Sequence, residues 1–117
     1  MSEFNFKSQK CTTREQSERL LSLGLKPETA DMHYSTDHRG NIRQLWLLAY
    51  GDLHEDVQAH SLPAWSLHRL LELNLLCCEQ HFAFQFHITN IDNAYEYLVN
   101  HTEWLIKEGY FNNEYLV

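Results

Sequence analysis

The sequence predicts an α+β fold, in which a small antiparallel sheet of about three strands carries three main helices packed mainly on one face. Three stretches with apolar residues at helical spacing follow capping signals, two extended segments flank a polar turn, and residues 82–88 alternate between apolar and polar side chains. With 117 residues, of which 44% are hydrophobic, we expect a single domain, residues 1–117, with residues 1–10 as a partly ordered tail.

The first helix is expected to begin at a capping box near the N-terminus. A threonine, Thr12 or Thr13, is followed three residues later by a Glu or Gln, and leucines then recur at helical spacing. Gly24 suits the left-handed conformation that ends a helix. A short second turn is predicted at residues 25–31, because Pro27 is tolerated at the first helical position.

A β-hairpin is predicted next. The chain looks extended at residues 32–35 and 42–50, and the polar residues 36–41 between them have turn chemistry. Large apolar residues occupy both parities of 42–50, so either both faces of this strand are covered or part of the run is not a strand. Residues 51–62 are acidic and contain few apolar side chains, which predicts a solvated loop.

The second half of the chain is predicted to hold two helices and one strand. Residues 63–73 read as a helix capped by Ser66, with Trp65 packing against Leu70. Residues 82–88 form the clearest strand of the chain.

A long helix is then predicted from about Ile91 to Glu108, capped by Thr89 and Asn90 and ended by Gly109. Its expected buried side consists of Ile91, Ala94, Tyr95, Leu98, Thr102, Leu105 and Ile106. The expected core joins strand and helix residues: Phe82, Phe84, Phe86 and Ile88 with Leu20, Leu21, Leu70, Leu71, Leu98 and Leu105.

The charge of the chain argues against several classes of partner. The net charge is −7, and residues 44–117 hold ten acids but only Arg69 and Lys107 as bases. Nucleic-acid backbones and anionic membranes are bound by clustered bases, so we expect neither as a partner. There is no signal-like N-terminus or long apolar run, and the three cysteines, Cys11, Cys77 and Cys78, are an odd number, which favours reduced thiols in the cytoplasm.

No pattern in the sequence points to a catalytic, cofactor or metal site. The best cluster of metal-ligating residue types is His54, Glu55, Asp56 and His60, which a solvated loop explains equally well. His81 and His87 share a strand face but lie roughly 20 Å apart at the usual strand rise, too far to hold one ion. Ser66 and His68 point to different sides of a helix, and Cys11 has no neighbouring histidine as a base.

Aromatic residues near the C-terminus form the candidate interface. This candidate interface consists of Trp104, Tyr110, Phe111 and Tyr115. Their rings present more aromatic surface than one small core readily buries, and tyrosine and tryptophan are favoured at protein interfaces. Two readings stay open here: these rings close over the core, or they meet another chain, including a second copy in a homodimer.

Three segments of the sequence resemble a known family. These are residues 13–32 (TREQSERLLSLGLKPETADM), residues 63–73 (PAWSLHRLLEL), and residues 93–99 (NAYEYLV) with 104–110 (WLIKEGY). Together they resemble small uncharacterised proteins carried by phages and mobile elements of gut bacteria. The resemblance covers less than half of the chain and implies a biological context, with no activity and no catalytic residue.

We therefore expect a non-enzymatic accessory or adaptor protein of a phage or mobile element, which acts through contacts with a protein partner. The alternative is an acidic decoy that mimics nucleic acid and occupies a host protein, prompted by the net charge of −8 over residues 44–117. A small hydrolase or metal enzyme ranks third. High salt discriminates between the first two, because it weakens binding through charge more than binding through apolar contact.

Overall fold

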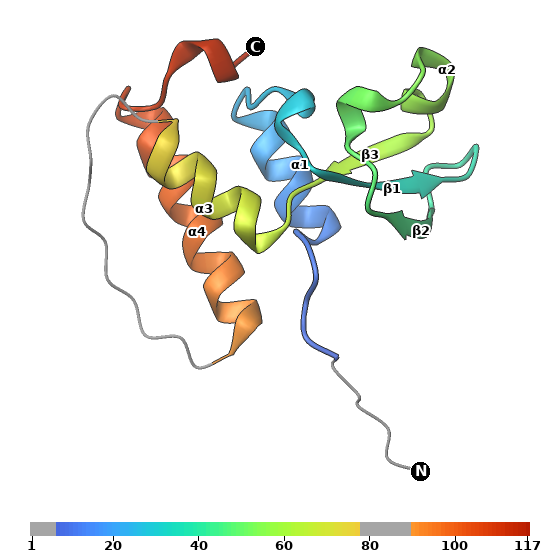
Figure 1. The fold of residues 1–117 in the computed structure, drawn as a ribbon, viewed down its shortest axis with the longest axis horizontal. Coiled ribbons are helices and arrows are strands. Elements are labelled where there is room, and N and C mark those ends of the chain that lie inside the picture. The colour runs from blue at the N-terminus through green and yellow to red at the C-terminus, as the bar shows by residue number, and fades with distance from the viewer. Residues whose placement is uncertain (1–6, 78–89) are drawn as a thin grey trace.

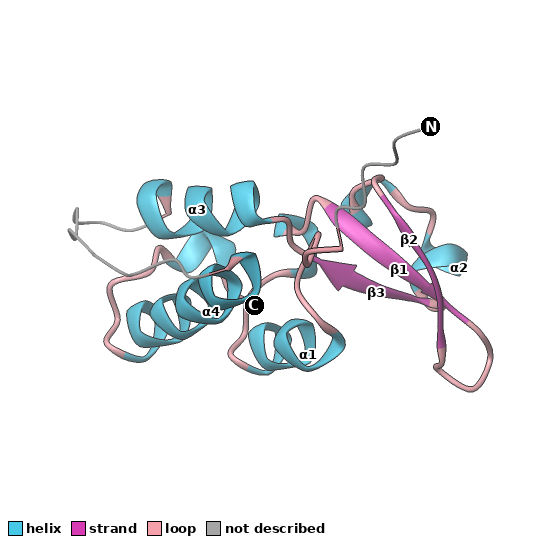
Figure 2. Ribbon diagram, turned by 90° about the horizontal axis from the view of Figure 1, so that it is seen from below, coloured by secondary structure: helices cyan, strands magenta, loops and turns pink. Residues whose placement is uncertain are grey.

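The computed structural model describes residues 7–77 and 90–117, which form a three-stranded antiparallel sheet and three longer helices (Figure 1). Figure 2 shows the longer helices grouped beside the sheet, towards one end of its strands, and the predicted α+β class with one small antiparallel sheet is confirmed. The longer helices are α1 (Arg14–Ser22), α3 (Leu67–Leu76) and α4 (Ile91–Lys107), and the strands are β1 (Met32–Thr36), β2 (Ile42–Trp46) and β3 (Ser61–Ala64). The shorter turns are η1 (Pro27–Thr29), η2 (Tyr50–Asp52), α2 (Glu55–Gln58) and η3 (Asn113–Tyr115).

The caps of α1 and α4 are the predicted ones. The Thr13 hydroxyl accepts from the Gln16 backbone N–H at 3.2 Å, and the Gln16 side-chain oxygen accepts from the Thr13 N–H at 3.0 Å, which completes the capping box. Asn90 caps α4 through the N–H three residues later. Gly24 and Gly109 adopt φ angles of 94° and 78°, which residues with a Cβ rarely adopt.

The predicted hairpin is confirmed, but its second strand is shorter than expected. β1 and β2 pair antiparallel, with His33 opposite Trp46. β2 ends at Trp46 and not at Tyr50, because His33 is already the second residue of β1 and little of that strand remains for pairing. The strand order is β2-β1-β3, so β2 and β3 are the two edges of the sheet.

The third strand lies where the sequence predicted loop and helix. β3 pairs with β1 through Ser61–Ala64, so the solvated loop at 51–62 and a helix beginning at Pro63 are both wrong. Proline has no N–H to donate, yet an edge strand tolerates it because one side of such a strand needs no ladder bonds. Helix α3 begins only after Ser66, whose hydroxyl caps it as predicted. The predicted strand at 82–88 lies outside the described residues.

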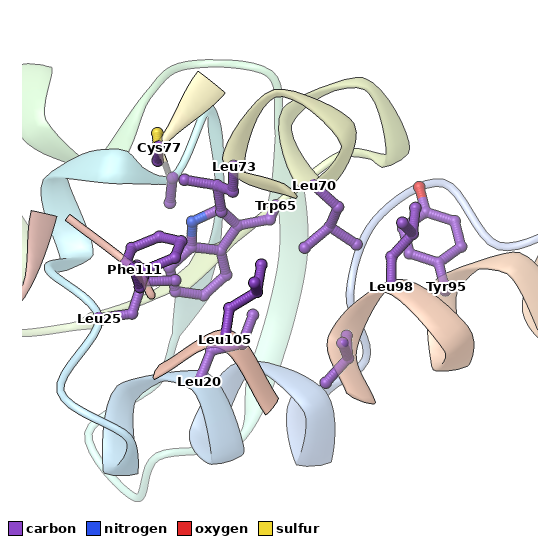
Figure 3. Close-up of a cluster of buried hydrophobic side chains, with 12 residues drawn as sticks. Leu20, Leu25, Trp65, Leu70, Leu73, Cys77, Tyr95, Leu98, Leu105 and Phe111 are labelled. Carbon is purple, nitrogen blue, oxygen red and sulfur yellow. The ribbon is translucent and has the colours of Figure 1, made fainter. Parts of the chain in front are cut away.

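The main core is built by the three longer helices around Trp65 (Figure 3). Leu20, Leu70, Leu98 and Leu105 are fully buried in it as predicted, whereas Leu21 and Leu71 are half-buried at its margin. Figure 3 shows the Trp65 ring at the centre, with Leu73 and Phe111 beside it. The predicted core residues Phe82, Phe84, Phe86 and Ile88 lie outside the described residues.

Ile106, which was expected inside, is half-buried, and the buried side of α4 differs more clearly from the prediction at two further positions. Ile91 was expected inside but is 40% exposed, because it is the first residue of the helix and lies at its open end. Val99 was not expected inside but is fully buried. Both differences arise from where the neighbouring elements end, which helical periodicity does not describe.

Candidate functional site

The predicted C-terminal interface is largely used inside the molecule. Phe111 is 3% exposed and belongs to the main core, so it offers no area to another chain. Tyr115 is half-buried and its ring lies edge-on to Phe111 at 6.2 Å. Trp104 remains 42% exposed and its ring lies 5.5 Å from that of Tyr110, which is half-buried. Of the two readings left open by the sequence, closing over the core is the one the structure shows for Phe111.

The C-terminal segment is tied to the turn after α1. The backbone N–H of Lys26 donates to the carbonyl of Tyr115 at 2.9 Å, and the N–H of Val117 donates to the carbonyl of Gly24 at 2.6 Å. Leu25 and Leu116 form an isolated antiparallel bridge between these bonds. The C-terminal segment therefore packs against the turn that follows α1, and it covers Leu25 in the core.

Large exposed apolar side chains concentrate at β2 instead. Ile42 is 38% exposed, Trp46 46%, Leu47 83% and Leu48 51%. We call these four residues the β2 patch. Three of them are consecutive, and the patch includes both ends of an edge strand. A cluster of this kind on a small protein typically marks an interaction surface, whereas scattered single apolar residues need no explanation.

A buried histidine holds the β2 patch in place. His33 is 4% exposed, and its Nδ1–H donates to the carbonyl of Leu48 at 2.7 Å. The Trp46 ring lies parallel to the His33 ring, with centroids 6.5 Å apart. The segment following β2 is thus fixed to β1, and its exposed side chains are presented from an ordered backbone.

The opposite face of the sheet near β2 is covered. Met32 and Ala64 pair across β1 and β3 and are buried together with Cys11, while Tyr34 and Leu45 pack against them. The Tyr34 hydroxyl donates to the carbonyl of residue 12 at 2.9 Å, which fixes the segment before α1 over this face. Leu45 therefore points into a small core, and its neighbour Trp46 points the other way, as strand geometry requires.

The sequence contained a signal for the β2 patch that our interpretation did not use. Residues 45–48, Leu-Trp-Leu-Leu, are four consecutive large apolar side chains. In a strand such a run must place apolar groups on both faces. Of the two readings left open for residues 42–50, the second is confirmed, because the strand ends at Trp46 and Leu47 and Leu48 lie beyond it with their side chains exposed.

The thiols are poor nucleophiles in their present surroundings. Burial raises the pKa of the Cys11 thiol, which lies 2.9 Å from the Tyr34 hydroxyl. Burial likewise raises the pKa of Cys77, although the Tyr115 hydroxyl partly offsets this. Because only the thiolate is strongly nucleophilic, neither residue is poised for covalent catalysis. Cys78 lies outside the described residues.

The other candidate groups act as local structural contacts. His54 accepts from the Asp56 N–H as the cap of α2, and its ring lies 3.6 Å from the Asp56 carboxylate in open solvent. Ser66 donates to Asp31 and caps α3, while His68 is exposed beside Glu72. Within residues 7–77 and 90–117 no three His, Cys, Asp or Glu side chains are placed to hold a metal. His81 and His87 lie outside these ranges.

A cavity of about 470 Å³ lies between η1, α3 and η3. Its charged groups are Lys26, Glu28, Arg69 and Glu72, and its apolar wall includes Leu73, Leu76, Cys77 and Tyr115. Arg69 is already engaged, because its guanidinium donates to the Thr29 carbonyl at 2.9 Å and to Glu72 at 3.0 Å. Charges of both signs balance in this cavity, so no ligand class is singled out by it.

Comparison with known proteins finds no match to this chain among family models, curated proteins or solved structures. In the part of the chain that the structure describes, no helix combines the length and the apolar character that crossing a membrane requires. The β2 patch is therefore characterised by its own geometry alone.

Proposed function

We propose that this chain is a non-enzymatic accessory or adaptor protein of a phage or mobile element, and that it binds a protein partner through the β2 patch. The observation that carries the proposal is the exposure of four large apolar side chains, Ile42, Trp46, Leu47 and Leu48, at one edge of the sheet. Burying such side chains is favourable by about 25 cal/mol for each Å² removed from water, so a partner that covers them gains affinity.

The proposed setting, a phage or mobile element in a host cell, is supported by the resemblance and by the free thiols. The resemblance to proteins of phages and mobile elements, over residues 13–32, 63–73, 93–99 and 104–110, suggests the genetic setting. Cys11 and Cys77 are free thiols, which suits the reducing cytoplasm of a host cell. An adaptor in that compartment requires a stable fold and an exposed contact surface, and it requires no catalytic group.

The acidic decoy is the second candidate function. It is supported by the net charge of −8 over residues 44–117. Part of that charge is already neutralised inside the molecule, since Glu96 and Glu103 contact Arg19 and Glu72 contacts Arg69. A nucleic-acid mimic depends on unpaired carboxylates, so this pairing ranks the decoy below the adaptor.

Affinity capture with matched variants tests the proposed function. The tagged full chain, Leu47→Asp and Val57→Asp are each used to capture partners from a lysate of the host bacterium, at low and high salt. Leu47 and Val57 are both exposed, so neither change is expected to unfold the chain, which circular dichroism checks. We expect a specific protein to survive high salt with the wild type and Val57→Asp and to be lost with Leu47→Asp. Equal retention by Leu47→Asp contradicts the proposal, and a basic protein that is released by salt favours the decoy.

A further inference from the structure

The free edge of β2 has the geometry to accept one more strand. Among the described residues β2 pairs with β1 on one side only, because it is the outer strand in the order β2-β1-β3. An edge strand presents a row of unpaired N–H and C=O groups, which an extended segment of another chain can pair with. Figure 2 shows β2 at the margin of the sheet, away from the longer helices.

The side chains of this edge suit an apolar partner strand. Ile42 lies at one end of β2 and Trp46 at the other, and Leu47 and Leu48 follow directly. In a strand added alongside, alternate residues come within about 5 Å of such side chains. Ile42 and Trp46 thus supply cross-strand contacts in addition to the backbone bonds, and Leu47 and Leu48 add apolar surface beyond the end of the strand.

The charged residues near the edge of β2 favour a partner segment of the opposite charge. Residues 37–51 contain Arg39, Arg43 and one acid, Asp37, so this segment carries +1 in a chain with a net charge of −7. In the described part of the chain neither arginine forms an ion pair with a carboxylate within 4 Å. The Asp37 carboxylate accepts from the N–H groups of Asn41 and Arg39, each at 2.9 Å, and these bonds together with the charge of Arg43 hold its pKa below the usual range.

A second copy of this chain fits the edge poorly. Two β2 strands that pair antiparallel bring both copies of Arg43 to the same edge, and like charges across strands are destabilising. Each copy also carries a net charge of −7.

We infer that β2 binds an extended segment of a partner protein as a fourth strand, and that this segment combines apolar residues with acidic ones. The inference rests on the proposed function, since it states how the β2 patch engages its partner. Backbone bonds to the edge and apolar contacts with Trp46 and Leu47 supply affinity, and Arg39 and Arg43 supply the preference for acids.

Peptide selection with the full chain as bait tests the inference. A random library of displayed ten-residue peptides is selected on the wild type and depleted on Leu47→Asp. We expect the enriched peptides to be acidic and rich in β-branched or aromatic residues. Enrichment of basic peptides overturns the charge assignment. If the wild type enriches nothing over Leu47→Asp, the inference fails, whereas the proposed function is decided by the affinity capture described above.

Amide hydrogen exchange then separates strand addition from other modes of binding. On adding an enriched peptide, we expect slower exchange at residues 42–46, because the outward N–H groups gain partners. The same peptide with N-methylated backbone amides should lose binding. Binding without new protection at 42–46 overturns strand addition but leaves the proposed function standing. Sedimentation that shows a dimer protected at 42–46 without peptide assigns the edge to a second copy instead.

A matched pair of charge variants tests the role of the arginines. Arg43→Glu and Lys107→Glu change the net charge equally, and both side chains are exposed. We expect Arg43→Glu to weaken binding of an acidic peptide about fivefold, the size typical of an exposed ion pair. Lys107→Glu, at the end of α4, should leave the affinity unchanged. Equal weakening by both variants shows that only the overall charge matters and contradicts a local acid site.

Discussion

The helical part of the molecule and the β1–β2 hairpin differ in how far their large apolar side chains are exposed. In the helical part, Leu20, Trp65, Leu98 and Leu105 are at most 1% exposed. In the hairpin and the residues that follow it, the β2 patch is between 38% and 83% exposed. Apolar content alone therefore does not say whether a segment serves folding or contact with a partner.

The difference follows from the number of neighbours each element has. Helices α1, α3 and α4 face one another and the C-terminal segment, so each apolar stripe has an opposing surface. In the sheet, the small cluster of Cys11, Met32 and Ala64 covers Leu45, whereas on the other face His33 is buried but Trp46, at the edge, is 46% exposed. A strand that carries large apolar side chains on both faces must then expose one set.

Replacing one tryptophan in each part, Trp65 and Trp46, tests this contrast with the largest expected effect. Trp65 is fully buried and its indole N–H donates to the Thr29 hydroxyl at 2.9 Å, so Trp65→Ala should lower the free energy of unfolding by about 3–5 kcal/mol. Trp46→Ala removes an exposed ring stacked on His33 and should cost less than about 1.5 kcal/mol. Urea denaturation measures both. Similar losses would mean that the hairpin is as tightly packed as the helical part.

A substitution at the contact between the hairpin and the helical part should lower the free energy of unfolding by an intermediate amount. Asp31 precedes β1, and its carboxylate accepts from both the backbone N–H and the hydroxyl of Ser66, the cap of α3. Asp31→Ala leaves these part-buried donors without their partner and should cost about 1.5–3 kcal/mol. Asp56→Ala, at a side chain that is 92% exposed, is the control and should change little in urea denaturation. A neutral Asp31→Ala would show that the two parts are held together by packing alone.

A smaller effect is expected on the pH dependence of stability, through a carboxylate in the helical part. Hydrogen bonding from Arg19, with Lys107 nearby, holds the pKa of Glu103 below its usual 4.5. Because this pKa is lower in the folded than in the unfolded chain, the stabilisation is present above the unfolded value and is lost as the pH falls through the folded value. The Glu103→Gln variant should therefore lose less stability than the wild type between pH 6 and pH 3, by less than about 1 kcal/mol.

The control for this titration is Glu108→Gln, which changes an exposed carboxylate at the end of the same helix. Thermal unfolding across the pH series measures all three proteins. If Glu103→Gln and Glu108→Gln flatten the profile equally, the Arg19 contact contributes nothing specific.

The smallest effect on stability is expected in the β2 patch itself. Leu47 is 83% exposed, so Leu47→Ala should change the free energy of unfolding by no more than about 0.5 kcal/mol. Leu105→Ala, the same substitution in the core, should cost about 2–5 kcal/mol. A large loss for Leu47→Ala in thermal unfolding would show that this residue packs within the chain and is not held for a partner.

Local signals in the sequence predicted the helices correctly. Thr13 and Ser66 cap their helices with side-chain oxygens, and Gly24 and Gly109 follow helix ends in the conformation that glycine favours. Each signal acts over three or four residues, so it can be read without knowledge of the fold. The hairpin was predicted for the same reason, because its polar turn lies between two short extended segments.

Pairing between distant segments was not predicted. Pro63 and Ala64 looked like the beginning of a helix, but β1 lies beside them and they form its third strand. Phe111 looked like a candidate for contact with another chain, but it packs on Leu25 and Trp65 in the core. In both cases the outcome depended on which segment lies opposite, and no local pattern contains that information.

The sequence by itself determined the class of fold, the caps of the longer helices and most of their buried residues, because these follow from short-range periodicity and hydrogen bonding. Only the tertiary structure decided that the C-terminal aromatic residues divide between core and surface and that the apolar run at 45–48 is exposed. The physical reason is that burial depends on two surfaces meeting, and the second surface is supplied by residues far away in the chain.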